Sequence, residues 1–122
     1  QRWESYYVED AQLVIVAYGI SSRISREAVR AARAKGIRLG MIRLITAFPF
    51  PEKAFKGLSK ECRALITVEM SAIEQIANDV RLADGCAHPI YSLCTGIRVP
   101  EPEDILALVD EILSKETEEA AK

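Results

Sequence analysis

Two short loops that carry hydroxyl side chains are the places in this sequence where a ligand could be held. One loop runs from Gly19 to Ser22 and the other from Glu69 to Ser71, and each joins an apolar segment to a segment of good helix formers. Free main-chain amides at the start of a helix bind anions, and ligands favour the crevice outside the carboxyl ends of parallel strands. The candidate residues for such an anion-binding crevice are Gly19, Ser21, Ser22, Glu69 and Ser71.

Helix capping is the competing interpretation of both loops. The first loop has one glycine and no lysine, so it matches neither the dinucleotide-binding fingerprint nor the P-loop. A serine at a helix N-cap stabilises the helix by about 1 kcal/mol without any ligand. Ser71 and Glu74 have the spacing of a capping box. We therefore predict hydroxyl caps at both loops and keep ligand binding as the alternative.

Four arginines form a basic stripe along one predicted helix. Arg23, Arg26, Arg30 and Arg33 are spaced by three, four and three residues, so they share one side of a helix. The stripe could meet the acidic surface of a partner subunit. Glu27 lies one turn from both Arg23 and Arg30 and could pair with either, which favours a solvated helix face instead.

The remaining reactive or aromatic residues give no catalytic motif. Phe48 and Phe50 alternate with prolines in a stiff loop, and we keep both internal packing and subunit contact open for them. His88 stands beside a proline with no nucleophile or carboxylate near it in the sequence. The three cysteines are too widely spaced for a metal or iron–sulfur signature, and nothing around them would lower a thiol pKa. We predict no catalytic residue, no cofactor-binding residue and no metal ligand in this chain.

A strand-helix-strand unit between Leu13 and Pro51 positions the first loop. Leu13–Tyr18 is a short apolar run rich in Val and Ile, typical of a strand that is buried on both faces of a parallel sheet. Arg23–Lys35 contains good helix formers and ends at Gly36, a residue suited to left-handed backbone. Apolar residues spaced by three and four form a stripe on this helix, and a further apolar segment after it is expected to be the next strand. The stripe is Ile24, Ala28, Ala31 and Ala32, and the strand is Arg38–Ile45.

The rest of the chain continues the alternation of strands and helices. Further strands are expected at Tyr6–Val8, Ala64–Val68 and Pro89–Cys94, the first of them at an edge. Short and longer helices should begin at Pro51, at Ser71 and at Pro102. The last helix has a buried stripe of Ile105, Leu108, Val109 and Ile112, after which the sequence turns polar and is expected to fray. The pattern predicts a three-layer α/β/α fold with a mostly parallel sheet.

Length and composition indicate one ordinary domain. The chain has 122 residues, of which 49% are hydrophobic, so it can bury a proper core. Lys and Arg total 16 against 18 Asp and Glu, a balance that argues against a nucleic-acid or membrane-surface protein. The odd number of cysteines and the lack of a long apolar run indicate a cytoplasmic protein with reduced thiols. We expect one domain over residues 1–116, cut from a longer polypeptide because the first residue is Gln1, and a polar tail over 117–122.

Three segments together resemble one enzyme family. They read VAYGISSRISREAVRAARAKGIRLGMIRLITAFPFP, LITVEMSAIEQIANDVRLA and GIRVPEPEDIL. Their combination is similar to the C-terminal domain of the α subunit of 2-oxoacid:ferredoxin oxidoreductases, and the resemblance covers nearly the whole chain. The Met70-Ser71 pair is most like the branched-chain, 2-oxoisovalerate members.

The resemblance implies a transketolase C-terminal-like fold, with five strands of which the first, at Tyr6–Val8, is the antiparallel edge strand. It also implies a parent enzyme that decarboxylates a 2-oxoacid on thiamine diphosphate with Mg, passes electrons through iron–sulfur clusters to ferredoxin, and forms an acyl-CoA. In such enzymes these cofactors are held outside this domain. The implied partners are the other domains of the α subunit and the β, γ and ferredoxin-type subunits.

Two classes of function follow. The first is an assembly domain of that oxidoreductase, inert when isolated; the C-terminal domain of a 2-oxoacid dehydrogenase β subunit shares the fold and is its nearest competitor. The second is a small anionic-ligand or nucleotide-binding module that uses the crevice between Gly19–Ser22 and Glu69–Ser71.

Overall fold

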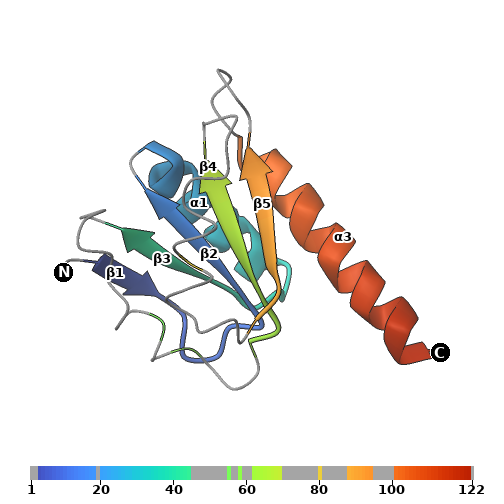
Figure 1. Cartoon of the computed structure of the whole chain (residues 1–122). Coiled ribbons are helices and arrows are strands. Elements are labelled where there is room, and N and C mark those ends of the chain that lie inside the picture. The colour runs from blue at the N-terminus through green and yellow to red at the C-terminus, as the bar shows by residue number, and fades with distance from the viewer. Residues whose placement is uncertain are drawn as a thin grey trace.

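The chain forms a five-stranded mixed sheet with helices packed on it (Figure 1). A computed structural model describes residues 3–18, 20–44, 55, 58, 62–69, 80, 88–94 and 101–121. The elements in chain order are β1 (Trp3–Tyr6), β2 (Leu13–Tyr18), α1 (Ile20–Ala34), β3 (Leu39–Leu44), β4 (Ala64–Glu69), β5 (Ile90–Cys94) and α3 (Pro102–Ala121).

The strands lie in the order β1-β3-β2-β4-β5. Strands β2 to β5 are mutually parallel, and β1 pairs antiparallel with β3 at one edge. In Figure 1 the arrowhead of β1 accordingly points opposite to those of the other strands. The prediction of a mostly parallel sheet with one antiparallel edge strand is confirmed.

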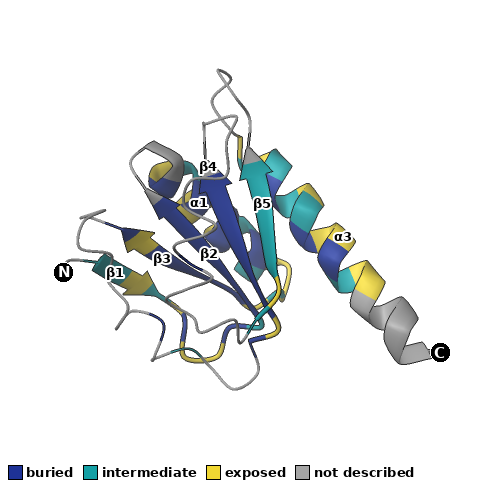
Figure 2. Ribbon diagram, in the orientation of Figure 1, coloured by how far each residue is buried: buried dark blue, intermediate teal, exposed yellow. Residues whose placement is uncertain are grey.

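Both faces of the sheet are buried, as the unbroken apolar strands predict. Leu13, Ile15 and Ala17 of β2 point to the face covered by α1 and α3. Val14 and Val16 point to the other face, where they pack with residues of neighbouring strands and of the connecting segments. The connecting residues on this second face are Val8, Ala11, Phe55, Cys62 and Val80. Figure 2 shows β2, β3 and β4 as the most buried strands.

Helix α1 begins at Ile20, three residues before the predicted start. Ser21 and Ser22 therefore lie in its first turn, and the prediction that one of them is the N-cap is wrong. The buried face is also turned relative to the predicted stripe. Ser25, Ala28, Val29 and Ala32 are at most 1% exposed, whereas Ile24 and Ala31 are half-buried. Small residues at these positions let the helix lie close to the sheet.

The end of α1 is a Schellman motif, and this part of the prediction is confirmed. Gly36 has a φ of 85°, in the left-handed region that glycine adopts without strain. Its amide donates to the carbonyl of Arg33 at 3.0 Å, and the amide of Ile37 donates to that of Ala32 at 2.9 Å. These two bonds satisfy carbonyls that the helix would otherwise leave free.

Strand β1 ends earlier than predicted. The sequence indicated Tyr6–Val8, but the strand covers Trp3–Tyr6. Tyr7 has a φ of 56°, which is costly for a bulky residue and breaks the extended backbone. Gly40 of β3 lies against this turn, and a Cβ atom at that position would be 2.8 Å from the main-chain oxygen of Tyr7. The turn and β3 therefore approach more closely than any side chain on residue 40 would allow.

Helix α3 begins at the predicted residue, Pro102. The Asp104 carboxylate accepts a hydrogen bond from the amide of Glu101 at 2.9 Å, which closes the reciprocal half of a capping box. Ile105, Val109 and Ile112 are buried, and Leu108 is half-buried.

The polar end of α3 is helical in its backbone to Ala121, where the sequence led us to expect fraying. It is rich in Glu, Lys and Ala, which favour helix, and Lys115 pairs with Glu111 one turn away at 3.5 Å. Figure 1 shows this end projecting past the sheet. The domain boundary at residue 116 stays a prediction.

Candidate functional site

The carboxyl ends of β2 and β4 lie next to each other, where the sequence placed the anion-binding crevice. The two strands are parallel neighbours, with Ala17 paired to Val68. Their last residues, Tyr18 and Glu69, thus share one edge of the sheet. The topology brings together the two loops that the sequence singled out.

The structure describes only part of that crevice. Ser22 is 4% exposed in the first turn of α1. Only the backbone of Ser21 and Glu69 is described, and Gly19 and Ser71 lie outside the described residues, as do Phe48 and Phe50. Ligand binding at the crevice and subunit contact by the two phenylalanines stay predictions.

A buried hydroxyl pair near this edge was not predicted. The Thr67 hydroxyl donates to the Ser92 hydroxyl at 3.0 Å, across β4 and β5, and Thr67 is fully buried. The signal in the sequence was a threonine within an otherwise apolar strand, because a buried hydroxyl needs a partner. The pair fixes the register of an edge strand close to the carboxyl ends of the sheet.

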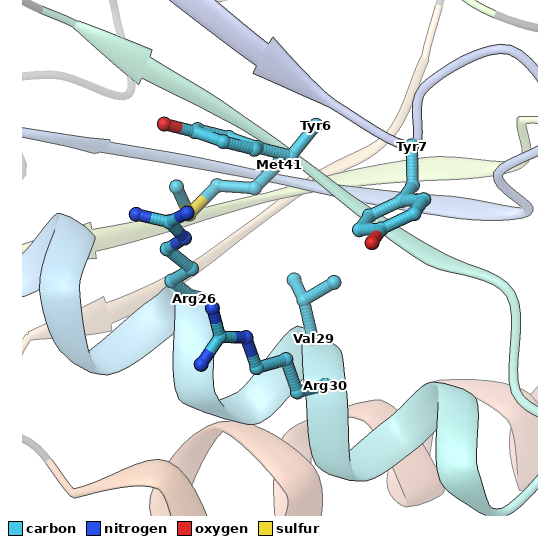
Figure 3. Close-up of a pocket in the computed structure, with 6 residues that line it drawn as sticks. All are labelled: Tyr6, Tyr7, Arg26, Val29, Arg30 and Met41. Atoms are coloured by element: carbon cyan, nitrogen blue, oxygen red, sulfur yellow. The ribbon is translucent and has the colours of Figure 1, made fainter.

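A second place with functional character lies between the end of β1 and α1. It is a small pocket of about 50 Å³ lined by Tyr6, Tyr7, Arg26, Val29, Arg30 and Met41. Figure 3 shows Arg26 and Val29 pointing from α1 toward Tyr6, Tyr7 and Met41, while the Arg30 side chain extends along α1 on the side of Arg26. Val29 and Met41 are buried and form an apolar floor, while Tyr7 is 56% exposed.

Arg33 ties the turn that carries Tyr7 to the body of the domain. Its guanidinium donates to the main-chain oxygens of Tyr7 at 2.9 Å and Leu39 at 3.0 Å. It also pairs with Asp10 at 2.8 Å and lies over the Tyr7 ring, 4.8 Å from the ring centre. The hydrogen bond from Arg33 lowers the pKa of Asp10. A planar guanidinium with five donors can satisfy all these partners at once, which a lysine cannot.

Arg26 is held by an aromatic ring. Its guanidinium stacks over Tyr6, 4.8 Å from the ring centre. The Tyr6 hydroxyl donates to the Glu4 carboxylate, and this hydrogen bond raises the pKa of Tyr6. Glu4 in turn lies 3.6 Å from Arg43 on the neighbouring strand.

The predicted arginine stripe therefore divides into residues with different surroundings. Arg33 serves the internal turn, and Arg26 stacks on Tyr6. Arg23 and Arg30 are exposed, and within the described part of the chain neither forms the expected ion pair with Glu27. The pairing that favoured a purely solvated face is thus not seen.

Cys62 and His88, the other reactive residues considered from the sequence that the structure describes, are not fully exposed. Cys62 is buried with its thiol 3.5 Å from the carbonyl oxygen of Ala64, as expected of a small apolar filler. His88 is half-buried in a bend before β5. Among the described residues, no group of His, Cys, Asp or Glu could hold a metal ion. None of the helices in the described segments is long and apolar enough to span a membrane.

Comparison with known proteins gives the family. Residues 11–105 match the family described as pyruvate:ferredoxin oxidoreductase core domain II. The chain belongs to this family. The match confirms the resemblance to 2-oxoacid:ferredoxin oxidoreductases that the sequence motifs indicated.

Two relatives of this chain are subunits of enzymes that act on 2-oxoacids. The ketoisovalerate oxidoreductase subunit VorB of Methanothermobacter marburgensis is 44% identical over 111 residues, which is 91% of this chain and 31% of that subunit. The 2-oxoglutarate synthase subunit KorA of the same organism is 32% identical over 100 residues, 82% of this chain and 27% of that subunit. The chain thus spans less than a third of the length of either subunit.

Solved structures confirm the fold expected for core domain II. The 2-oxoglutarate:ferredoxin oxidoreductase of Magnetococcus marinus, solved with 2-oxoglutarate, coenzyme A and succinyl-CoA bound, superposes with a TM-score of 0.78 at 22% identity and covers 91% of this chain and 19% of its own. A split-gene transketolase, described as an inactive beta4 tetramer, gives a TM-score of 0.71 at 18% identity and covers 91% of this chain and 41% of its own. The predicted transketolase C-terminal-like architecture is therefore right.

Proposed function

We propose that this chain is a structural and assembly domain of a 2-oxoacid:ferredoxin oxidoreductase whose substrate is 2-oxoisovalerate. The parent enzyme would oxidatively decarboxylate the 2-oxoacid, transfer the acyl group to coenzyme A and reduce ferredoxin. The observation that carries the substrate is the 44% identity to a ketoisovalerate oxidoreductase subunit, against 32% to a 2-oxoglutarate synthase subunit.

In this proposal the domain supports the enzyme without taking part in its chemistry. Thiamine diphosphate, Mg and the iron–sulfur clusters belong to other domains and to the β, γ and ferredoxin-type subunits, and the complex works in the cytoplasm. Support comes from the family match over residues 11–105.

The test is a ferredoxin- or viologen-reduction assay on the full-length subunit that contains this chain, reconstituted with its partner subunits. The substrates 2-oxoisovalerate, pyruvate and 2-oxoglutarate are compared with and without coenzyme A. A clear preference for 2-oxoisovalerate with CoA-dependent turnover is expected. Preference for another acid would discard the substrate, and turnover by the isolated domain would discard the assembly role.

A second candidate function is an anionic-ligand site at the crevice, favoured by the adjacency of the β2 and β4 ends. Titration of this chain with inorganic phosphate, followed by amide NMR, should then shift Ser21, Ser22 and Glu69. Shifts elsewhere, or none, would rule out this candidate.

A further inference from the structure

We propose that the pocket of Tyr7, Arg26 and Arg30 is a docking site for an acidic side chain, Asp or Glu, of another subunit of the complex. The proposal rests on the assembly role proposed above and names the surface that performs it.

The charge of the pocket calls for a carboxylate partner. None of the six residues that line it is acidic, and two of them are arginines. Helix α1 contains four arginines and a single acidic residue, Glu27. Within the described part of the chain, neither Arg26 nor Arg30 forms an ion pair. A guanidinium presents parallel donors that match the two oxygens of a carboxylate.

The pocket is preorganised for binding. Stacking on Tyr6 holds Arg26 in place, so less side-chain entropy is lost when a partner binds. Arg33 holds Tyr7 in a left-handed conformation that costs backbone energy, and yet the residue is 56% exposed. The apolar floor of Val29 and Met41 excludes water from below, which strengthens an ion pair formed above it.

The shape of the pocket favours a protein over a small molecule. Sites that enclose a free ligand usually measure about 300–1,000 Å³, whereas this pocket measures about 50 Å³. Tyrosine and arginine dominate the residues that carry binding energy at protein interfaces. The chain also spans only 31% of a relative that is itself one subunit of an oxidoreductase, so neighbouring polypeptide surfaces are available.

The first test measures assembly of the full-length subunit with its partner subunits by mass photometry. The double variant Arg26→Glu/Arg30→Glu should raise the dissociation constant at least about tenfold, and Tyr7→Ala should weaken assembly by a smaller factor. The control is Lys35→Glu, which makes the same charge change as each of the two substitutions, at an exposed residue just beyond the end of α1. Equal affinities for the wild type and the double variant would overturn the proposal and leave the assembly role intact. Failure of the wild type to assemble would overturn both.

The second test identifies the partner residue. Arg30→Lys keeps the positive charge and provides an amine that a zero-length carbodiimide joins to any carboxylate in contact with it. Mass spectrometry of the assembled complex should find Lys at position 30 joined to an Asp or Glu of another subunit. A cross-link from position 30 only to acidic residues of this chain would overturn the proposal. It would also be overturned if free acetate or phosphate at millimolar concentration displaced the partner subunit.

Discussion

The guanidinium of Arg33 donates to the main-chain oxygen of Tyr7, 26 residues earlier in the chain, at 2.9 Å. This bond joins the end of α1 to the turn that follows β1. Because the same side chain also donates to the main-chain oxygen of Leu39 at the start of β3, one residue connects three elements.

Removal of Arg33 should destabilise the domain. Arg33→Ala leaves two main-chain oxygens without their donor, and we expect a loss of about 1–3 kcal/mol in the free energy of unfolding, measured with urea. Arg30→Ala, on the exposed side of the same helix, is the control and should change the stability by less than about 0.5 kcal/mol. Similar losses for the two variants would contradict the role given to Arg33.

The Asp10–Arg33 pair should make the free energy of unfolding fall as the pH is lowered into the acid range. The bond from Arg33 lowers the pKa of Asp10 below its usual value of 3.8. The carboxylate therefore stabilises the folded state above that value, and its contribution is lost as the pH falls through the lowered pKa. The stability difference between the wild type and Asp10→Asn should shrink between about pH 5 and pH 2. A difference that stays constant over this range would show that the pair contributes nothing.

Gly40 should tolerate no side chain. A Cβ atom there would lie 2.8 Å from the oxygen of Tyr7 and 3.0 Å from the Cβ of Ala11. Gly40→Ala should therefore cost about 1–3 kcal/mol by overpacking. Gly36→Ala is the useful comparison, because its Cβ would meet nothing within 4 Å and only the φ of 85° opposes it, at a cost of about 1 kcal/mol. NMR should show displacement of the Tyr7 turn in the first variant and not in the second.

The last turns of α3 should be dispensable for the fold. Ile112 is 1% exposed, and Ile112→Ala should cost about 2–4 kcal/mol. Truncation after Glu116 removes residues beyond the buried stripe and should change the unfolding free energy by less than about 0.5 kcal/mol. A truncated chain as unstable as Ile112→Ala would place the domain boundary beyond residue 116.

The central strands could be predicted because a short segment of apolar residues is typical of a strand that is buried on both faces. Leu13–Tyr18 is apolar throughout, and the structure gives the strand the same bounds. The end of β1 could not be predicted in this way. Tyr6, Tyr7 and Val8 all favour strands, whereas Tyr7 adopts a left-handed conformation in which its main-chain oxygen accepts from Arg33 and lies close to Gly40. Those contacts come from residues distant in the sequence.

The candidate functional surfaces were also predictable only in part, because some of their features depend on contacts between residues that are distant in the sequence. The spacing of the arginines predicted a basic helix face, and the structure confirms that Arg23, Arg26 and Arg30 are exposed. Spacing alone could not show that Arg33 turns inward or that Arg26 meets Tyr6. The meeting of the β2 and β4 ends followed from the expected parallel sheet, because parallel neighbours end at one edge.

The position of β1 at the edge of the sheet also sets an order of events during synthesis. Its described partner is β3, and Trp3 pairs with Leu44. On the ribosome, β1 must therefore wait for about forty further residues before its hydrogen bonds can form, with a loop-closure cost that grows only slowly with this length. The β2-α1-β3 unit contains nearer contacts and can form earlier. The pocket, which needs Tyr6 and Tyr7 against α1, would then be completed only after that unit has formed, so an acidic partner bound there would select chains in which β1 has paired with β3.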